Sequence, residues 1–354
     1  MLKKLFIAAL LLLLLAPLGL FLTSPVEPVA WRPDPVSALE GDLRKNNLLD
    51  NVRILAAGNL PEPEDLIFDN EGWLYTGLND GRIVKFKPDS PNQIIELTNT
   101  DGRPLGLRFN AQGDLIVADT ERGLISVSPQ GDIDVLVDTF DGRKLLLVDH
   151  LDIADNGDIY FSDASARFGL DKHLLDFIEA SSTGAVYKYS ARTKQTTPVM
   201  DSLFFSNGVA LGPGDEYLLV AETGRARILK HFLSGPKQGQ TEVFIDALPA
   251  MPDNLYYDEE GTLWVGLIVL RDWRVEKLAA YPVIRKIIGA IPPAWLKPTD
   301  RYGFVIGINM DGKITHNLQT ESGYTNITAA IKHNNKLYLG GLGNDAIAVY
   351  EGSL

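Results

Sequence analysis

A turn-and-strand unit that recurs through most of this chain restricts its fold more than any other feature. The unit has a polar turn, which contains glycine in five of the six copies, then a strand of alternating apolar residues, then a second hairpin. The copies begin at Phe68, Phe109, Ala154, Gly212, Tyr257 and Lys332. A repeat of about 40 to 50 residues with two hairpins is typical of a propeller blade. The sequence therefore predicts an all-β fold, a six-bladed β-propeller.

The ends of the repeat region and two interruptions define the predicted domain. Asn51–Ala56 precedes the first copy, and we expect it to close the ring by completing the last blade, so that residues 51–354 form the propeller. Phe168–Ala180 is expected to form a short helix. Residues from about 267 to 299 form a predicted helical insert with Lys and Arg opposite an apolar face. Such an insert is typical of an interfacial helix or lid, or alternatively of a helix packed on the propeller face.

The N-terminus carries an unbroken apolar run. Leu5–Leu22 is 18 residues long, and as a helix it would span about 27 Å, close to the roughly 30 Å core of a bilayer. Lys3 and Lys4 precede it and favour a cytoplasmic N-terminus. We expect residues 1–23 to be a single-pass signal-anchor, residues 24–50 a linker, and the propeller to lie on the exported, periplasmic or extracytoplasmic side. The alternative is a signal that is cleaved to release a secreted protein.

Charge and residue usage exclude several classes of function. The net charge is −13, which argues against nucleic acid as a partner because phosphate recognition needs a basic surface. The chain has no cysteine, so disulfides, zinc–thiolate sites and thiol nucleophiles are excluded. It also lacks a Gly-x-Ser-x-Gly elbow, a His-Glu-x-x-His motif and a Walker loop. An acidic chain of this kind suits a site that holds a cation.

Several segments, in order along the chain, resemble one known family. They include Pro63–Asp69, Gly102–Phe109, Tyr160–Ser165, Ser206–Leu211 and Met251–Leu255. The set is similar to the strictosidine synthase-like proteins, especially those of the adipocyte plasma membrane-associated type. That group belongs with gluconolactonases and paraoxonases among calcium-dependent six-bladed propellers. The resemblance implies the same fold and a calcium-dependent hydrolase activity.

Four oxygen-bearing residues occupy one equivalent position in four predicted blades. Glu64, Asp149, Asn207 and Asp253 each precede an apolar inner strand and lie seven or eight residues before the turn glycine, so we expect them to converge on the propeller axis. Asn254 stands beside Asp253. Calcium takes about six to eight oxygen ligands, and the resemblance implies that Glu64, Asn207 and Asp253 ligate a catalytic calcium. The alternative is that these residues are ordinary turn residues.

Asp149 and His150 depart from the family pattern, which has Asn followed by Asp there. A third carboxylate at Asp149 should bind calcium more tightly but lower the Lewis acidity of the ion, and it could equally suit another divalent metal. His150 is a candidate catalytic base, or alternatively a hydrogen-bonded histidine beside a ligand. Arg103 is a candidate to orient a substrate carbonyl, or alternatively a salt-bridged structural arginine.

These features predict a calcium-dependent hydrolase of esters or lactones that acts on a lipophilic small molecule near a membrane. Asp253, or a water activated by a carboxylate, would supply the nucleophile. The alternative is a non-catalytic, membrane-anchored binding propeller in which calcium is structural. Strictosidine synthase activity itself is not expected, because that chemistry relies on a glutamate in the last blade and Tyr324–Ala330 contains none. The sequence indicates no oligomeric state.

Overall fold

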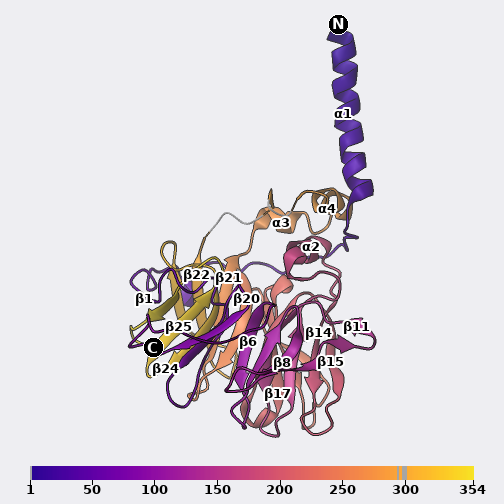
Figure 1. Ribbon diagram of the computed structural model, residues 1–354. Coiled ribbons are helices and arrows are strands. Elements are labelled where there is room, and N and C mark those ends of the chain that lie inside the picture. The colour runs from indigo at the N-terminus through magenta and orange to yellow at the C-terminus, as the bar shows by residue number, and fades with distance from the viewer. Residues whose placement is uncertain (1, 293–294, 297–300) are drawn as a thin grey trace.

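The chain forms a six-bladed β-propeller, as the repeat predicts. The structure is a computed structural model that describes residues 2–292, 295–296 and 301–354 (Figure 1). These residues form six four-stranded antiparallel sheets and one further two-stranded hairpin. The innermost strands of the sheets, β2, β6, β12, β16, β20 and β24, each contact the next one around a closed ring. Every blade therefore brings one strand to the central axis.

The blades are numbered here in chain order, and their strands run from the axis outward. Blades 1 and 2 contain β2 (Leu66–Phe68), β3 (Leu74–Gly77), β4 (Arg82–Phe86), β5 (Ile95–Asn99), β6 (Pro104–Phe109), β7 (Leu115–Asp119), β8 (Gly123–Val127) and β9 (Ile133–Val137). The hairpin of β10 (Thr139–Phe140) and β11 (Arg143–Lys144) precedes blade 3. Blades 3 and 4 contain β12 (Val148–Ile153), β13 (Ile159–Asp163), β14 (Gly184–Tyr189), β15 (Thr196–Leu203), β16 (Ser206–Leu211), β17 (Tyr217–Glu222), β18 (Arg227–Phe232) and β19 (Thr241–Ile245). Blades 5 and 6 contain β20 (Ala250–Tyr257), β21 (Leu263–Leu270), β22 (Gly303–Ile308), β23 (Ile314–Thr320), β24 (Ile327–His333), β25 (Lys336–Gly341), β26 (Ile347–Tyr350) and β1 (Arg53–Leu55).

The ring is closed by the N-terminal strand of the propeller. β1 pairs antiparallel with β26, with Arg53 opposite Val349 and Leu55 opposite Ile347. Blade 6 thus takes three strands from the C-terminal end and its outermost strand from the N-terminal end. The prediction that Asn51–Ala56 completes the last blade is confirmed. The pairing also covers an edge of β26 that would otherwise stay open.

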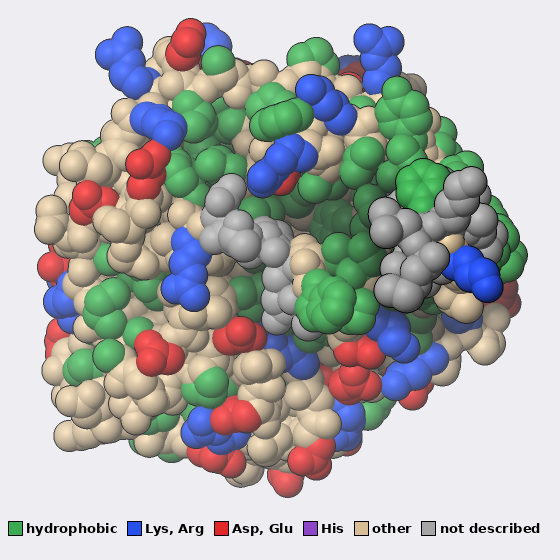
Figure 2. Space-filling model, turned by 90° about the horizontal axis from the view of Figure 1, so that it is seen from above, with side chains coloured by type: hydrophobic (Ala, Val, Ile, Leu, Met, Phe, Trp, Pro, Cys, Tyr) green, Lys and Arg blue, Asp and Glu red, His purple; other side chains and the backbone are tan. Residues whose placement is uncertain are grey.

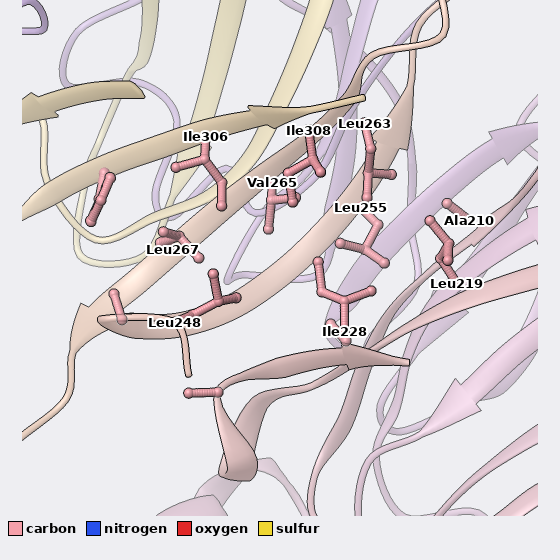
Figure 3. Packing of buried hydrophobic residues seen from close by; sticks show 14 of the residues in the cluster. Ala210, Leu219, Ile228, Leu248, Leu255, Leu263, Val265, Leu267, Ile306 and Ile308 are labelled. Carbon is pink, nitrogen blue, oxygen red and sulfur yellow. The ribbon is translucent and has the colours of Figure 1, made fainter. Parts of the chain in front are cut away.

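Apolar side chains fill the space between neighbouring blades. Between blades 4 and 5, Leu219 and Ile228 pack with Leu255 and Val265, and all four are almost completely buried (Figure 3). A fully buried leucine or isoleucine contributes about 1.5 to 3 kcal/mol. The strands of one blade are thereby held against those of the next, and this contact fixes the position of the inner strands.

Helices gather on one face of the propeller. They are α2 (His173–Glu179), α3 (Trp273–Lys277) and α4 (Pro282–Gly289), and α1 (Leu2–Thr23) extends away from the same face (Figure 1). Single 3-10 turns are η1 (Gly41–Leu43), η2 (Leu170–Lys172), η3 (Pro213–Asp215) and η4 (Thr223–Arg225). The short helix predicted within Phe168–Ala180 is confirmed. Among the described residues we find no helix long and apolar enough to cross a membrane, and the anchor assigned to residues 1–23 stays a prediction.

The helical insert begins later than the predicted residue 267. Leu267 and Leu270 still belong to β21, where they pair with Pro252 and Ala250 of β20. The apolar run that we assigned to the insert instead prolongs a strand, because a continuous apolar segment fits a strand and a buried helix equally well. The predicted end of the insert, near residue 299, lies outside the described residues.

The segment between α1 and the propeller is packed against the helical face. Val26 is buried against Phe168 and Leu175. Further along, Arg285 donates a hydrogen bond of 2.8 Å to the carbonyl oxygen of Val29, and Arg271 donates one of 2.6 Å to that of Asp34. The predicted linker is therefore attached to the helical face at several points.

Candidate functional site

The innermost strands bring the five predicted metal ligands into the interior of the ring. Glu64 lies two residues before β2, Asp149 lies in β12, Asn207 in β16, and Asp253 and Asn254 in β20. All five side chains are buried. Their equivalent places in the repeat thus correspond to equivalent places beside the axis.

Irregular strand pairing marks this level of the propeller. The register between β12 and β13 shifts between Val148 and Leu151. The same happens in β16 between Ser206 and Val209, and in β20 between Pro252 and Leu255. Such a bulge places extra residues of one strand opposite its neighbour and re-aims their side chains. Asp149, Asn207, Asp253 and Asn254 all lie in these bulges. In a regular strand only every second side chain points to the same face. In these bulges two successive residues can reach the axis region.

Three glycines make room for the ligand-bearing segments. A Cβ atom on Gly208 would lie 2.4 Å from the carbonyl oxygen of Asp253, and one on Gly340 would lie 2.7 Å from that of Glu64. On Gly106 it would lie 2.8 Å from the Cα of His150. Only a residue without a side chain permits this close approach of neighbouring backbones. The candidate ligands are therefore placed by packing between blades.

The five side chains form one interacting group. Asn254 Nδ2 donates a hydrogen bond of 2.9 Å to Glu64 Oε1, and the side chain of Asn207 lowers the pKa of Asp253 against the effect of burial. Burial raises the pKa of Glu64 well above its usual value, and the charges of Asp253 and Asp149 raise it further. Burial also raises the pKa of Asp149, with Asp253 adding to the effect, and it raises the pKa of Asp253 to about 8. Buried carboxylates that repel one another favour a bound cation.

The unpartnered oxygens of this group suit a hard cation. Glu64 Oε2, Asn207 Oδ1 and Asn254 Oδ1 are buried without a hydrogen-bond partner among the described residues. Leaving a buried acceptor unsatisfied costs about 1 to 3 kcal/mol, and a divalent ion with oxygen preference would satisfy all three. No cluster of three or more acidic or histidine side chains able to hold a metal is found in the described part of the chain. The case for a cation rests on the mixed carboxylate and amide oxygens.

Arg103 makes the contacts of a structural arginine and keeps one donor without a partner among the described residues. Its side chain is buried, Nη2 donates a hydrogen bond of 3.0 Å to the carbonyl oxygen of Glu62, and the Glu62 carboxylate lies 4.0 Å away. Its positive charge lowers the pKa of Glu64 and Asp149 against the effect of burial. Nη1 is buried with no hydrogen-bond partner in residues 2–292, 295–296 and 301–354. One donor of this guanidinium thus stays available beside the carboxylates.

His150 is engaged through both ring nitrogens. Nδ1 lies 3.1 Å from the backbone of Val209, and Nε2 lies 3.2 Å from Nη2 of Arg108. The ring is completely buried, and burial together with the charge of Arg108 holds its pKa well below the usual range. These contacts favour the hydrogen-bonded histidine over a base that exchanges protons with a substrate.

Sequence reasoning missed a buried ion pair of this region, formed by Asp65 and Arg108. Both are buried, and Arg108 Nη1 donates a hydrogen bond of 2.9 Å to Asp65 Oδ2. A signal was present, since Arg108 is a lone charge in the otherwise apolar strand Pro104–Phe109. Thr328 was also missed, although its hydroxyl donates a bond of 2.6 Å to the carbonyl oxygen of Glu64.

Comparison with known families gives two matches. A model described as "Strictosidine synthase-like, N-terminal" matches residues 41–86, and one described as "Strictosidine synthase" matches residues 149–236. The second range contains two of the five candidate ligands, Asp149 and Asn207, and it also contains His150.

Two curated relatives span most of the chain. Protein STRICTOSIDINE SYNTHASE-LIKE 4 of Arabidopsis thaliana is 31% identical over 326 residues, covering 90% of this chain and 85% of the relative. The adipocyte plasma membrane-associated protein of Rattus norvegicus is 30% identical over 344 residues, covering 91% of each chain. The similarity therefore extends over nearly the whole length of both proteins.

Solved structures share the fold at low sequence identity. A gluconolactonase from Xanthomonas campestris superposes with a TM-score of 0.61 at 16% identity, covering 92% of this chain and 98% of its own. Regucalcin from Agrobacterium tumefaciens, described as a calcium-binding protein, gives a TM-score of 0.57 at 12% identity over 84% and 92%. These likenesses concern the propeller architecture.

Proposed function

The chain belongs to the strictosidine synthase-like family, and from this premise we propose that it is a calcium-dependent hydrolase of esters or lactones. One observation carries the proposal: buried oxygens of Glu64, Asn207 and Asn254 have no hydrogen-bond partner within the described part of the chain, beside the carboxyl groups of Asp149 and Asp253. Burying such a group costs free energy unless its oxygens bind a cation.

Each side chain of the group has a role in the proposed site. Glu64, Asp149, Asn207, Asp253 and Asn254 would hold the ion through oxygen. A bound calcium would polarise the ester or lactone carbonyl and stabilise the negative charge that develops on its oxygen. The hydrogen bond from Asn254 orients Glu64, and the side chain of Asn207 favours the charged form of Asp253.

Asp253 is the proposed catalytic carboxylate. It would attack the carbonyl carbon or take a proton from the attacking water. Arg103 Nη1, which has no partner in the described part of the chain, would donate to the carbonyl oxygen of the substrate. His150 receives no role in proton transfer, because both its nitrogens are already engaged.

The helical face supports a lipophilic substrate and a membrane tether. Trp273 and Val283 of α3 and α4 are 60% and 62% exposed, and Figure 2 shows hydrophobic side chains gathered on this face. The apolar helix α1 leaves the propeller from the same face. A relative is named a plasma membrane-associated protein. We infer that residues 1–23 anchor the chain and that substrates reach the propeller from the bilayer side.

The proposal is tested with the full-length chain in detergent micelles. Hydrolysis of phenyl acetate and of medium-chain lactones is measured with calcium and with chelator, for the wild type, Asp253→Ala and the exposed turn variant Asp311→Ala as control. We expect activity that needs calcium, that is lost in Asp253→Ala and that is retained in Asp311→Ala. Activity that is indifferent to chelator would overturn the proposal.

A non-catalytic binding propeller is the second candidate. Asp149 favours it, because a third carboxylate holds an ion more tightly and makes it a weaker Lewis acid. A melting temperature that falls with chelator, together with no turnover of any ester or lactone tested, would support this alternative.

A further inference from the structure

A second group of charged side chains is built from residues next to the candidate ligands. Asp65 follows Glu64 in the chain and His150 follows Asp149, and Arg108 contacts both. Arg108 Nη1 donates hydrogen bonds of 2.9 Å to Asp65 Oδ2 and 2.7 Å to the carbonyl oxygen of Leu107, and Nη2 lies 3.2 Å from His150 Nε2. Nη2 also donates a bond of 3.3 Å to the carbonyl oxygen of Leu255, the residue after Asn254.

This single guanidinium connects the inner strands of several blades. Asp65 belongs to blade 1, Arg108 to blade 2, His150 to blade 3 and Leu255 to blade 5. His150 continues the connection to Val209 of blade 4 through Nδ1 at 3.1 Å. Each hydrogen-bond partner of Arg108 outside its own blade is the direct chain neighbour of a candidate ligand. Arg108 Nε also lies 3.9 Å from Asp152 Oδ1 of blade 3. A movement of the guanidinium would therefore move Glu64, Asp149 and Asn254 relative to one another.

The arrangement is more specific than a surface ion pair. Arg108 is only 8% exposed, and Asp65 and His150 are 1% and 0% exposed. A buried charge of this kind is stable only when its donors are satisfied in a fixed geometry. The planar fork of arginine supplies several donors at set angles, whereas lysine supplies a compact point charge.

We propose that Arg108 is a positioning residue, an internal cation that holds the segments bearing Glu64, Asp149 and Asn254 at the spacing a calcium ion requires. The inference rests on the proposed function, since it concerns the same ion. Partners behind metal ligands commonly change metal affinity about 10- to 100-fold when they are removed.

The effect on calcium affinity distinguishes a positioning role from a purely electrostatic role, here called a background charge. Removing a positive charge near a cation site should strengthen calcium binding by electrostatics alone. Loss of positioning should weaken it. Arg108→Met removes the charge and the fork, and Arg108→Lys keeps the charge but loses the fork. Positioning predicts weaker binding in both variants, whereas a background charge predicts tighter binding in Arg108→Met and unchanged binding in Arg108→Lys.

The matched control is Arg285→Met. Arg285 is 5% exposed and bonds to the carbonyl oxygens of Val29, Ala279 and Phe177, so it is an equally buried arginine in the helical face. Both methionine variants should lower the melting temperature, but only the change at Arg108 should alter calcium binding.

Calcium binding is measured by titration calorimetry on the full-length chain in micelles, with folding checked by circular dichroism. We expect Arg108→Met and Arg108→Lys to bind calcium about tenfold or more weakly than the wild type, and Arg285→Met to bind within about twofold of it. Wild-type affinity or tighter in the folded Arg108 variants would overturn the inference; if Arg108→Met does not fold, Arg108→Lys decides. A wild type that binds no calcium would instead refute the proposed function.

Discussion

Asn254 donates a hydrogen bond of 2.9 Å to Glu64, across 190 positions of the chain and between blades 5 and 1. The bond engages Oε1 of Glu64 and the amide nitrogen of Asn254. It leaves Oε2 and Oδ1 of the same two side chains without partners among the described residues. Two oxygens are thus oriented before any ion binds, which reduces the entropy cost of binding one.

Replacement of Asp253 by asparagine should separate charge from shape. Asp253→Asn keeps the size of the side chain and removes a carboxylate, so we expect calcium affinity to fall about 10- to 100-fold. Hydrolysis of phenyl acetate should fall about 100-fold or more, because the proposed nucleophile or base is lost. Calorimetry and initial rates measure both effects, and Asp311→Asn serves as the control. Unchanged calcium affinity would show that Asp253 is not a ligand.

Asp149→Asn should change affinity and turnover in opposite directions. Removal of the third carboxylate weakens calcium binding by about tenfold, because less negative charge surrounds the ion. The ion then withdraws electrons from the substrate more strongly, so kcat at saturating calcium should rise. Calorimetry gives the affinity, and rates at several calcium concentrations give kcat. A kcat that falls together with the affinity would contradict this account of Asp149.

Gly208→Ala tests whether packing between blades places the ligands. The added Cβ would lie 2.4 Å from the carbonyl oxygen of Asp253, so the bulge in β20 must shift. We expect a loss of about 1 to 3 kcal/mol in the free energy of unfolding and weaker calcium binding. Urea unfolding and calorimetry measure the two quantities.

Gly169→Ala is the matched control, because the added Cβ would lie 3.5 Å from its nearest atom, Oδ1 of Asp171, which is an ordinary van der Waals contact. Its stability should stay within about 0.5 kcal/mol of the wild type. Equal effects of the two alanines would show that the close approach at Gly208 has no special part in the site.

Asp176 makes stability depend on pH. Its pKa is raised to about 6, chiefly by burial; the hydrogen bond from the Ser165 hydroxyl opposes the rise and the charge of Glu179 adds to it. Because the folded state binds this proton more tightly than the unfolded state, stability should fall as pH rises from about 4 to 6 and stay lower above that range. Asp176→Asn cannot ionise, so it should be about 1 to 3 kcal/mol more stable than the wild type at pH 8.

The extra stability of Asp176→Asn relative to the wild type should shrink to near zero at pH 4. Unfolding by urea at several pH values measures it, with the exposed neighbour Asp171→Asn as a control that shows no such trend. A gain that is equal at pH 4 and pH 8 would assign the effect to packing and not to ionisation.

The repeat predicted the architecture well, because each blade is a local unit. The turn glycines and alternating apolar residues define six copies, and Asn51–Ala56 was correctly expected to close the ring. The predicted start of the helical insert at residue 267 was wrong, because Leu267–Leu270 belongs to β21. A continuous apolar run has no periodicity that separates strand from helix, so only its pairing with β20 decides.

The candidate site was partly predictable for the same reason. Glu64, Asn207 and Asp253 share one position in the repeat, and equivalent positions in a propeller are brought to equivalent places around the axis. The contacts of Arg108 with Asp65 and His150 were not predictable, because they join residues more than 40 positions apart.

The order of residues alone therefore determined the blade, its number of copies and the oxygen-bearing residues at its inner strands, since hydrophobic periodicity and turn chemistry act over a few neighbouring residues. Only the tertiary structure decided which oxygens remain without partners, which glycines admit a neighbouring backbone, and which arginine lies behind the ligands. Those properties arise where different blades meet at the axis, and they depend on packing between segments that the chain separates widely.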